Sequence, residues 1–151
     1  MLPPFRQSLT MALFSAREAI MSRMRPILRA HGVTEQQWRV LRTLTDAGEV
    51  EVTVLSRRAM LHPPSLTRIL RDLVARGLVR RRCDETDMRR GLVSISPLGL
   101  ALIREAAPEV ARATQEINRL YGPEQGRRLR ELLAGLERVL GCGAIEVHGE
   151  D

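Results

Sequence analysis

The chain has 151 residues, the size of one domain or of a small domain with helical extensions. Aromatic residues make up only 3% of it, which argues against binding single-stranded nucleic acid by base stacking. The net charge is +6, and every basic residue is an arginine. No apolar run approaches the roughly 20 residues that span a bilayer, and charged residues interrupt the N-terminal segment where a signal peptide needs an apolar core. We therefore expect a cytoplasmic protein without membrane contact.

The first predicted element is a long helix over residues 8–29, within an N-terminal segment, 5–32, that we expect to dimerise. Pro26 predicts a kink in this helix, and His31 with Gly32 predicts its end. Its two stripes at helical spacing are Leu9, Leu13, Ala16, Ile20 and Ile27, and Thr10, Phe14, Arg17, Met21, Met24 and Leu28. Two such stripes indicate a helix buried against more than one neighbour.

Arg17 interrupts the second, otherwise mostly apolar stripe. A charged group on an apolar face needs a partner, because burying it alone is costly. One interpretation is an internal ion pair with an acid on another helix. The other is a receptor for the carboxylate of a small ligand.

The second predicted helix begins at a capping box, Thr34 to Gln37, and ends at Gly48. Trp38, the single tryptophan, faces inward with the leucines that follow it, either as a core residue or as the wall of a pocket. If the first two helices pack together, a pocket between them would hold such a ligand with its carboxylate on Arg17. The predicted ligand-binding residues are Phe14, Arg17, Met21, Trp38 and Arg39.

Residues 34–96 are predicted to form a winged helix-turn-helix. After a short loop, 49–52, Thr53 is expected to cap the first helix of the pair. The residues expected to pack this helix on its partner are Leu55, Ala59, Met60 and Leu61.

The second helix of the pair starts at the sequence His62-Pro63-Pro64-Ser65, since proline lacks an N–H and fixes φ near the helical value. Gly77 supplies its C-terminal cap. The face predicted to be buried comprises Leu66, Ile69, Leu70, Leu73 and Val74, and the opposite polar face Ser65, Thr67, Arg68, Arg71 and Asp72. Such a helix suits the major groove of DNA.

Two short strands, 78–79 and 92–95, are predicted to form a two-strand wing whose tip is residues 84–90. Between Arg57 and Arg90 lie ten arginines and four acids, so this window carries the whole net charge of the chain. A localised basic excess is typical of a phosphate-binding surface. The alternative is a basic hairpin that is merely solvated.

Ser96 and Pro97 predict the start of a long amphipathic helix that ends at Gly122, with a possible bend at Pro108. A last helix spans residues 123–140, and residues 141–151 are expected to be a frayed tail. Together, residues 97–141 carry more apolar surface than a winged unit can cover. We therefore expect a homodimer, which also matches a palindromic DNA site.

Cys83 and Cys142 are too few for a disulfide framework, although a redox-responsive regulator acting through either thiol is the alternative function. The three histidines have no ligand-spaced neighbours, so no metal or other cofactor is expected. The sequence contains no nucleophile–base pair and no glycine-rich phosphate loop, and we do not expect an enzyme.

The order of these elements resembles the MarR family of bacterial regulators over nearly the whole chain. The segment 84–90 is similar to the acidic-then-arginine wing motif of that family, and 95–99 to its exit from strand to helix. The resemblance implies a recognition helix over Pro64–Arg76. It also implies that Arg89 enters the minor groove and that Asp87 orients it.

The N-terminal segments 8–19, 25–27 and 34–39 resemble the branch of the family that represses homoprotocatechuate (4-hydroxyphenylacetate) catabolic operons. That resemblance implies a repressor of an aromatic-acid catabolic operon, released from double-stranded operator DNA by a small aromatic carboxylate. The predicted DNA-binding residues are Ser65, Thr67, Arg68, Arg71, Asp87, Arg89 and Arg90.

Overall fold

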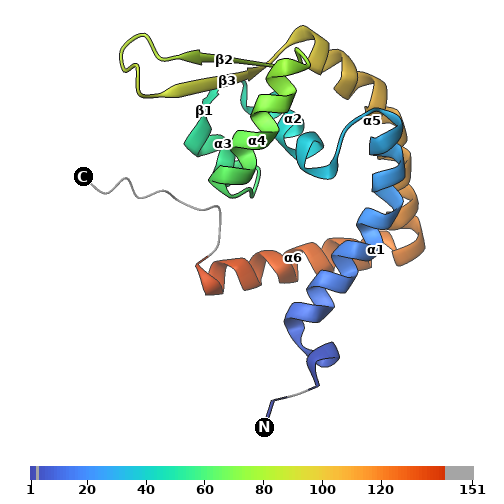
Figure 1. The fold of residues 1–151 in the computed structure, drawn as a ribbon. Coiled ribbons are helices and arrows are strands. Elements are labelled where there is room, and N and C mark those ends of the chain that lie inside the picture. The colour runs from blue at the N-terminus through green and yellow to red at the C-terminus, as the bar shows by residue number, and fades with distance from the viewer. Residues whose placement is uncertain (3, 142–151) are drawn as a thin grey trace.

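A small winged unit, formed by α2–α4 and the sheet, adjoins a group of long helices, α1, α5 and α6, in the computed structural model, which describes residues 1–2 and 4–141 (Figure 1). The elements are η1 (Phe5–Gln7), α1 (Leu9–Ala30), α2 (Glu35–Ala47), β1 (Val50–Glu51), α3 (Val52–Arg58), α4 (Pro63–Ala75), β2 (Val79–Cys83), β3 (Gly91–Ile95), α5 (Pro97–Tyr121) and α6 (Pro123–Leu140). The mostly helical, winged helix-turn-helix prediction is confirmed. The predicted tail after Gly141 lies outside the described residues.

Side-chain caps fix the starts of three helices, two of them, at Thr34 and Ser96, as predicted. Ser8 Oγ accepts a hydrogen bond from the Met11 N–H at the start of α1, at 3.2 Å. At α2 the Thr34 hydroxyl accepts from the Gln37 N–H at 3.1 Å, and the Gln37 side chain accepts from the Thr34 N–H at 3.0 Å. Ser96 caps α5 in the same way. These bonds satisfy backbone N–H groups that have no partner inside a helix.

The sheet has three strands in the order β1-β3-β2, whereas the sequence predicted a two-strand wing. Val50 pairs with Val93 and Glu51 with Leu92, so part of the predicted loop 49–52 is a strand. A strand of two residues has no alternation of its own to reveal it. It exists because β3, much later in the chain, supplies its hydrogen bonds.

Two predictions around α3 are wrong. The helix begins at Val52 after Glu51, which makes no side-chain cap, so Thr53 does not cap it. Met60, expected to pack inward, is 66% exposed and has a φ of +55°. It is the left-handed residue that ends α3, and the next residue, Leu61, closes the turn by donating its N–H to the Ser56 carbonyl at 2.9 Å.

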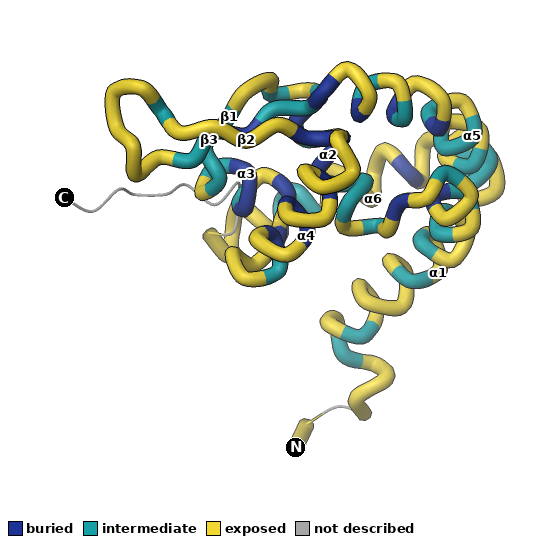
Figure 2. Tube along the Cα trace, turned by 45° about the horizontal axis from the view of Figure 1, so that its top comes forward, coloured by how far each residue is buried: buried dark blue, intermediate teal, exposed yellow. Residues whose placement is uncertain are grey.

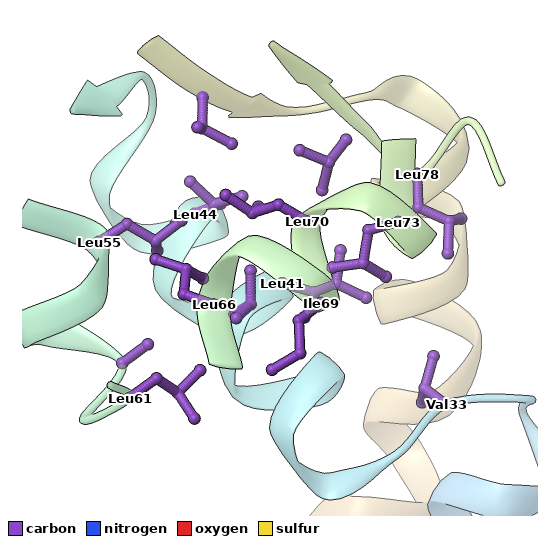
Figure 3. Close-up of a cluster of buried hydrophobic side chains, with 14 of the residues drawn as sticks. Val33, Leu41, Leu44, Leu55, Leu61, Leu66, Ile69, Leu70, Leu73 and Leu78 are labelled. Atoms are coloured by element: carbon purple, nitrogen blue, oxygen red, sulfur yellow. The ribbon is translucent and has the colours of Figure 1, made fainter. Parts of the chain in front are cut away.

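The core lies between α4 and its neighbours (Figure 3). Leucines of α2, α3 and α4 fill it, among them Leu41, Leu44, Leu55, Leu66 and Leu73, all fully buried. Val74 was predicted to join them but is 40% exposed. A row of residues four apart drifts by about 40° per step around a helix, so the last member of the Leu66–Leu70–Val74 row leaves the core.

The long helices keep much of their apolar surface outside this core (Figure 2). In α1 only Leu28 is buried, so the two stripes are not buried within a single chain. The exposed apolar residues of the long helices include Leu9, Leu13, Phe14, Ile20, Leu120, Tyr121, Leu129, Leu132, Val139 and Leu140. This is the surface that the sequence assigned to dimerisation.

Candidate nucleic-acid interface and effector region

The outer face of α4 presents two arginines to solvent. Arg68 and Arg71 are exposed, because the leucine stripe on the opposite side of the helix is fixed in the core. Thr67 is exposed and donates its hydroxyl to the Pro63 carbonyl at 3.0 Å, while Ser65 is half-buried. Within the described residues neither arginine has a carboxylate within 4.0 Å. Their charges are therefore free to meet an anionic surface.

The wing tip is a closed loop between β2 and β3. The Asp84 N–H donates to the Arg90 carbonyl at 2.9 Å, and the Arg90 N–H to the Asp87 carbonyl at 3.0 Å. The Asp87 carboxylate accepts the backbone N–H of Arg89 at 3.0 Å. Asp87 thus orients Arg89 through its backbone. The Arg89 guanidinium has no carboxylate within 4.0 Å in the part of the chain that the structure describes.

Asp84, which sequence reasoning did not single out, also shapes this loop. Its carboxylate accepts the N–H of Thr86 at 2.9 Å and the Thr86 hydroxyl at 2.8 Å. These bonds to Thr86 hold the pKa of Asp84 below its ordinary value. An aspartate two residues before a threonine in a turn is the only local signal for this role.

The structure separates Arg90 from Arg89, although the sequence grouped them as DNA contacts. The Arg90 guanidinium pairs with Glu51 of β1 and lies 3.9 Å from Asp84. A second arginine, Arg82 of β2, pairs with Glu49 at 2.6 Å. The hydrogen bond from Arg82 lowers the pKa of Glu49.

A direct link joins α4 to the start of α2. The Gln37 side-chain amide donates to the Asp72 carboxylate at 2.6 Å, across a long separation in sequence. Arg76, just after α4, donates to the Gly32 carbonyl at 2.8 Å and lies 3.6 Å from Asp72. Sequence reasoning assigned Gln37 only a capping role. One end of this link, Gln37, directly precedes the predicted effector residues Trp38 and Arg39 in α2.

The predicted ligand residues lie along α1 and the first turns of α2. Met21, Trp38 and Arg39 are half-buried, and Trp38 packs against the core. Phe14 is 57% exposed, so within one chain it does not enclose a ring against Trp38. A hollow of about 260 Å³ lies nearby, but it is lined by residues outside the predicted set: Arg25, Arg29, Val33, Thr34, Glu35 and Gln36.

Arg17 takes part in a cluster of ion pairs, as the first of its two interpretations required. It pairs with Glu35 of α2 and lies 3.2 Å from Glu18. Arg25 bridges the same two acids, with two hydrogen bonds of 2.8 Å to Glu18 and two of 3.2 and 3.3 Å to Glu35. The hydrogen bond from Arg25 is the main cause of a lowered pKa at Glu18. Arg17 is nevertheless 45% exposed, so it is not the buried charge that the stripe suggested.

Arg39, unlike Arg17, is left with an unmet hydrogen-bond donor. Its Nε is buried and has no hydrogen-bond partner among the described residues. Burial lowers the pKa of Arg39, and the positive charge of Arg17 lowers it further. A buried donor without a partner is costly. An anion placed here would supply the missing acceptor and relieve the repulsion between the two arginines.

The chain was compared with known proteins. A family model described as "MarR family" matches residues 33–90. The homoprotocatechuate degradative operon repressor of Escherichia coli is 39% identical over 126 residues, covering 83% of this chain and 85% of the relative. The chain belongs to the MarR family.

Solved structures of similar chains agree with the fold. The transcriptional regulator PA4135 is 40% identical with a TM-score of 0.84, covering 89% of this chain and 98% of that one. NadR in complex with 4-hydroxyphenylacetate is 35% identical with a TM-score of 0.76, covering 90% of this chain and 96% of that one. The residues that the family model matches include all of α4 and the wing tip.

Other features of this MarR chain bear on the remaining predictions. Cys83 is an exposed free thiol at the end of β2, while Cys142 lies outside the described residues. In the described part of the chain, no group of three or more histidine, cysteine or acidic side chains is arranged to hold a metal ion. None of the described helices combines the length and apolar character needed to cross a membrane.

Proposed function

We propose that this MarR protein is a homodimeric repressor that binds a palindromic operator through α4 and the wing and releases it on binding a small aromatic carboxylate. The observation that carries the DNA-binding half is the pair of uncompensated arginines, Arg68 and Arg71, on a helix face that the core holds outward. Phosphate contacts by such arginines position a recognition helix, and contacts to guanine edges give it specificity.

The wing would complete the interface. Arg89 projects from a loop that Asp87 orders, and an arginine in this position suits the narrow, strongly negative minor groove of A·T-rich DNA. Ser65 and Thr67, at the start of α4, would lie nearest the groove floor, as the first residues of recognition helices do. Thr67 keeps its acceptor lone pairs free because its hydroxyl proton is used inside the helix.

The apolar surface of α1, α5 and α6 supports a dimer. Phe14, Leu132 and Val139 are 57%, 67% and 84% exposed in one chain, on helices that pack only partly on the winged unit. A second copy would cover these side chains and place two α4 helices on adjacent half-sites, about 34–36 Å apart.

The effector half of the proposal is supported by the arginines at the α1–α2 junction. Arg39 lacks an acceptor for its Nε, and Arg17 can exchange the Glu35 carboxylate for that of a ligand. The ring would lie among Phe14, Met21 and Trp38, with Phe14 ordered by the partner helices of the dimer. An aromatic acid also fits the names of the relatives, one a homoprotocatechuate operon repressor and one solved with 4-hydroxyphenylacetate.

Trp38 offers a direct test, because it is the only tryptophan of the chain. We expect 4-hydroxyphenylacetate to change the Trp38 fluorescence saturably and to release DNA over the same concentration range. Arg17→Ala should keep DNA binding but lose the response to the acid. If this variant fails to dimerise, Arg17 is a structural ion pair, and if it responds normally, the carboxylate binds elsewhere. Release by oxidant instead of by the acid would favour a redox regulator acting through a thiol.

A further inference from the structure

Two acids beside the sheet each hold an arginine of the wing. Glu49, just before β1, pairs with Arg82 through bonds of 2.6 and 2.9 Å. Glu51, within β1, pairs with Arg90. Part of the wing's positive charge is therefore paired with carboxylates of this chain, and the rest is not.

The register of the sheet explains why Glu51 reaches Arg90. Glu51 lies opposite Leu92 of β3, and Arg90 precedes Leu92 by two residues. Residues two apart on an extended chain share a face, so Arg90 lies on the Leu92 side of the ribbon. The hydrogen bond from the Asp84 N–H to the Arg90 carbonyl places Arg90 at the neck of the loop. From the neck its side chain folds back to β1.

The neighbouring arginine is in the opposite situation. Arg89 has its N–H fixed by Asp87 and no carboxylate within 4.0 Å among the described residues. Arg90 is 49% exposed and Glu51 30% exposed, so water reaches the pair. Of these two consecutive arginines of the wing, Arg90 is therefore held in an ion pair and Arg89 is not.

We propose that Glu51 is a positioning residue of the wing, which holds Arg90 away from the DNA backbone so that, of the two consecutive arginines of the wing loop, only Arg89 is offered to DNA. The proposal rests on the proposed DNA-binding function. It changes the expectation for Arg90 from a phosphate contact to a structural partner of β1. It also lowers by one the number of counterions that each wing releases on binding.

The salt dependence of DNA binding reports how many cations of the protein contact phosphates. On B-DNA, each phosphate contact adds about 0.9 to the slope of log affinity against log salt concentration. The probe is a duplex selected by the wild-type protein from a randomised double-stranded library. Glu51→Gln removes the closer of the two carboxylates at Arg90 and leaves only Asp84 at 3.9 Å, so its slope should be steeper than wild type by up to about 0.9 for each wing bound. Arg90→Ala should leave the slope unchanged, and the double variant should return to the wild-type slope.

Two further variants separate release of Arg90 from a change in net charge. Glu85→Gln removes one negative charge from the wing loop, where Glu85 has no cation within 4.0 Å among the described residues, and it should leave the slope unchanged. Glu51→Asp keeps the charge but shortens the side chain, and it should steepen the slope by less than Glu51→Gln does. It also serves as the test if Glu51→Gln fails to fold, as judged by circular dichroism.

An unchanged slope for both Glu51 variants would overturn the inference. So would a shallower slope for Arg90→Ala, because Arg90 would then already contact phosphate in the wild-type complex. Either result leaves the proposed function standing, since the wild-type protein still binds DNA. A wild-type protein that selects no duplex, even at low salt, would instead overturn the proposed function and this inference with it.

Discussion

Replacing Arg39 by methionine should stabilise the ligand-free protein while removing its response to the effector. The Arg39 Nε is buried without an acceptor, and an unsatisfied buried donor costs about 1–3 kcal/mol. Because the residue is only half-buried, we take the lower end, a gain of about 1 kcal/mol in the free energy of unfolding. Methionine is unbranched and adaptable, so it fills the space of the arginine stem without a buried polar group.

The assay is thermal unfolding with and without 4-hydroxyphenylacetate. For a chain of this size, 1 kcal/mol shifts Tm by about 2–4 °C, so the ligand-free variant should melt about 2–4 °C above wild type. A ligand at 100 times its Kd adds about 2.7 kcal/mol, which should raise the wild-type Tm by roughly 5–11 °C. The variant should show little of this second increase.

The exposed Arg104 of α5 provides the matched control, because Arg104→Met removes an arginine without touching the site. This control should melt at the wild-type Tm both without and with 4-hydroxyphenylacetate. The reasoning is refuted if Arg39→Met melts below wild type, which would mean that the guanidinium has a stabilising partner. It is also refuted if the variant gains as much Tm from the acid as wild type does.

Three further outcomes follow from the interface and the fold. Arg89→Ala should weaken operator binding at least tenfold, about 1.4 kcal/mol, without changing the circular dichroism spectrum, and a gel shift within twofold of wild type would contradict this. Arg68→Ala should cost about 1–3 kcal/mol more on the selected operator than on random duplex, whereas equal losses would make Arg68 a phosphate contact. Gly99→Ala should lower the free energy of unfolding by about 1–3 kcal/mol in a denaturant titration, because a Cβ there would lie 2.3 Å from the Leu78 carbonyl oxygen and 2.7 Å from Ile95 Cγ1. An unchanged midpoint would show that the backbone moves to accommodate the methyl group without cost.

The helices could be predicted from sequence because their signals are local. Ser8, Thr34 and Ser96 cap the helices that they precede in sequence, and Pro63 starts α4 as its fixed φ requires. The leucine spacing of α4 then fixed which face turns outward. That is why Arg68 and the rest of the polar face could be named without coordinates.

The features that sequence reasoning missed depend on residues far apart in the chain. β1 exists only because β3 pairs with it, and the ion pair between Glu51 and Arg90 depends on that same register. The bond from Gln37 to Asp72 joins two helices whose approach no local pattern specifies. In each case the sequence shows the polar residues but not which of them meet.

The effector region was only partly predictable for a related reason. The break in the apolar stripe correctly marked Arg17 as a residue that needs a partner, and Glu35 is that partner within the chain. The exposure of Phe14 could not be foreseen, because an apolar stripe shows that a surface will be covered but not by which chain.

The most direct test of the account is operator binding measured by fluorescence anisotropy while 4-hydroxyphenylacetate is titrated against the complex. 4-Methylphenol, which keeps the phenol ring but lacks the carboxylate, is the matched control ligand. The account predicts that the dimer binds the selected duplex, that the acid releases it saturably, and that 4-methylphenol does not. Release by both compounds alike, or by neither, would contradict a site in which an arginine at the α1–α2 junction receives the carboxylate.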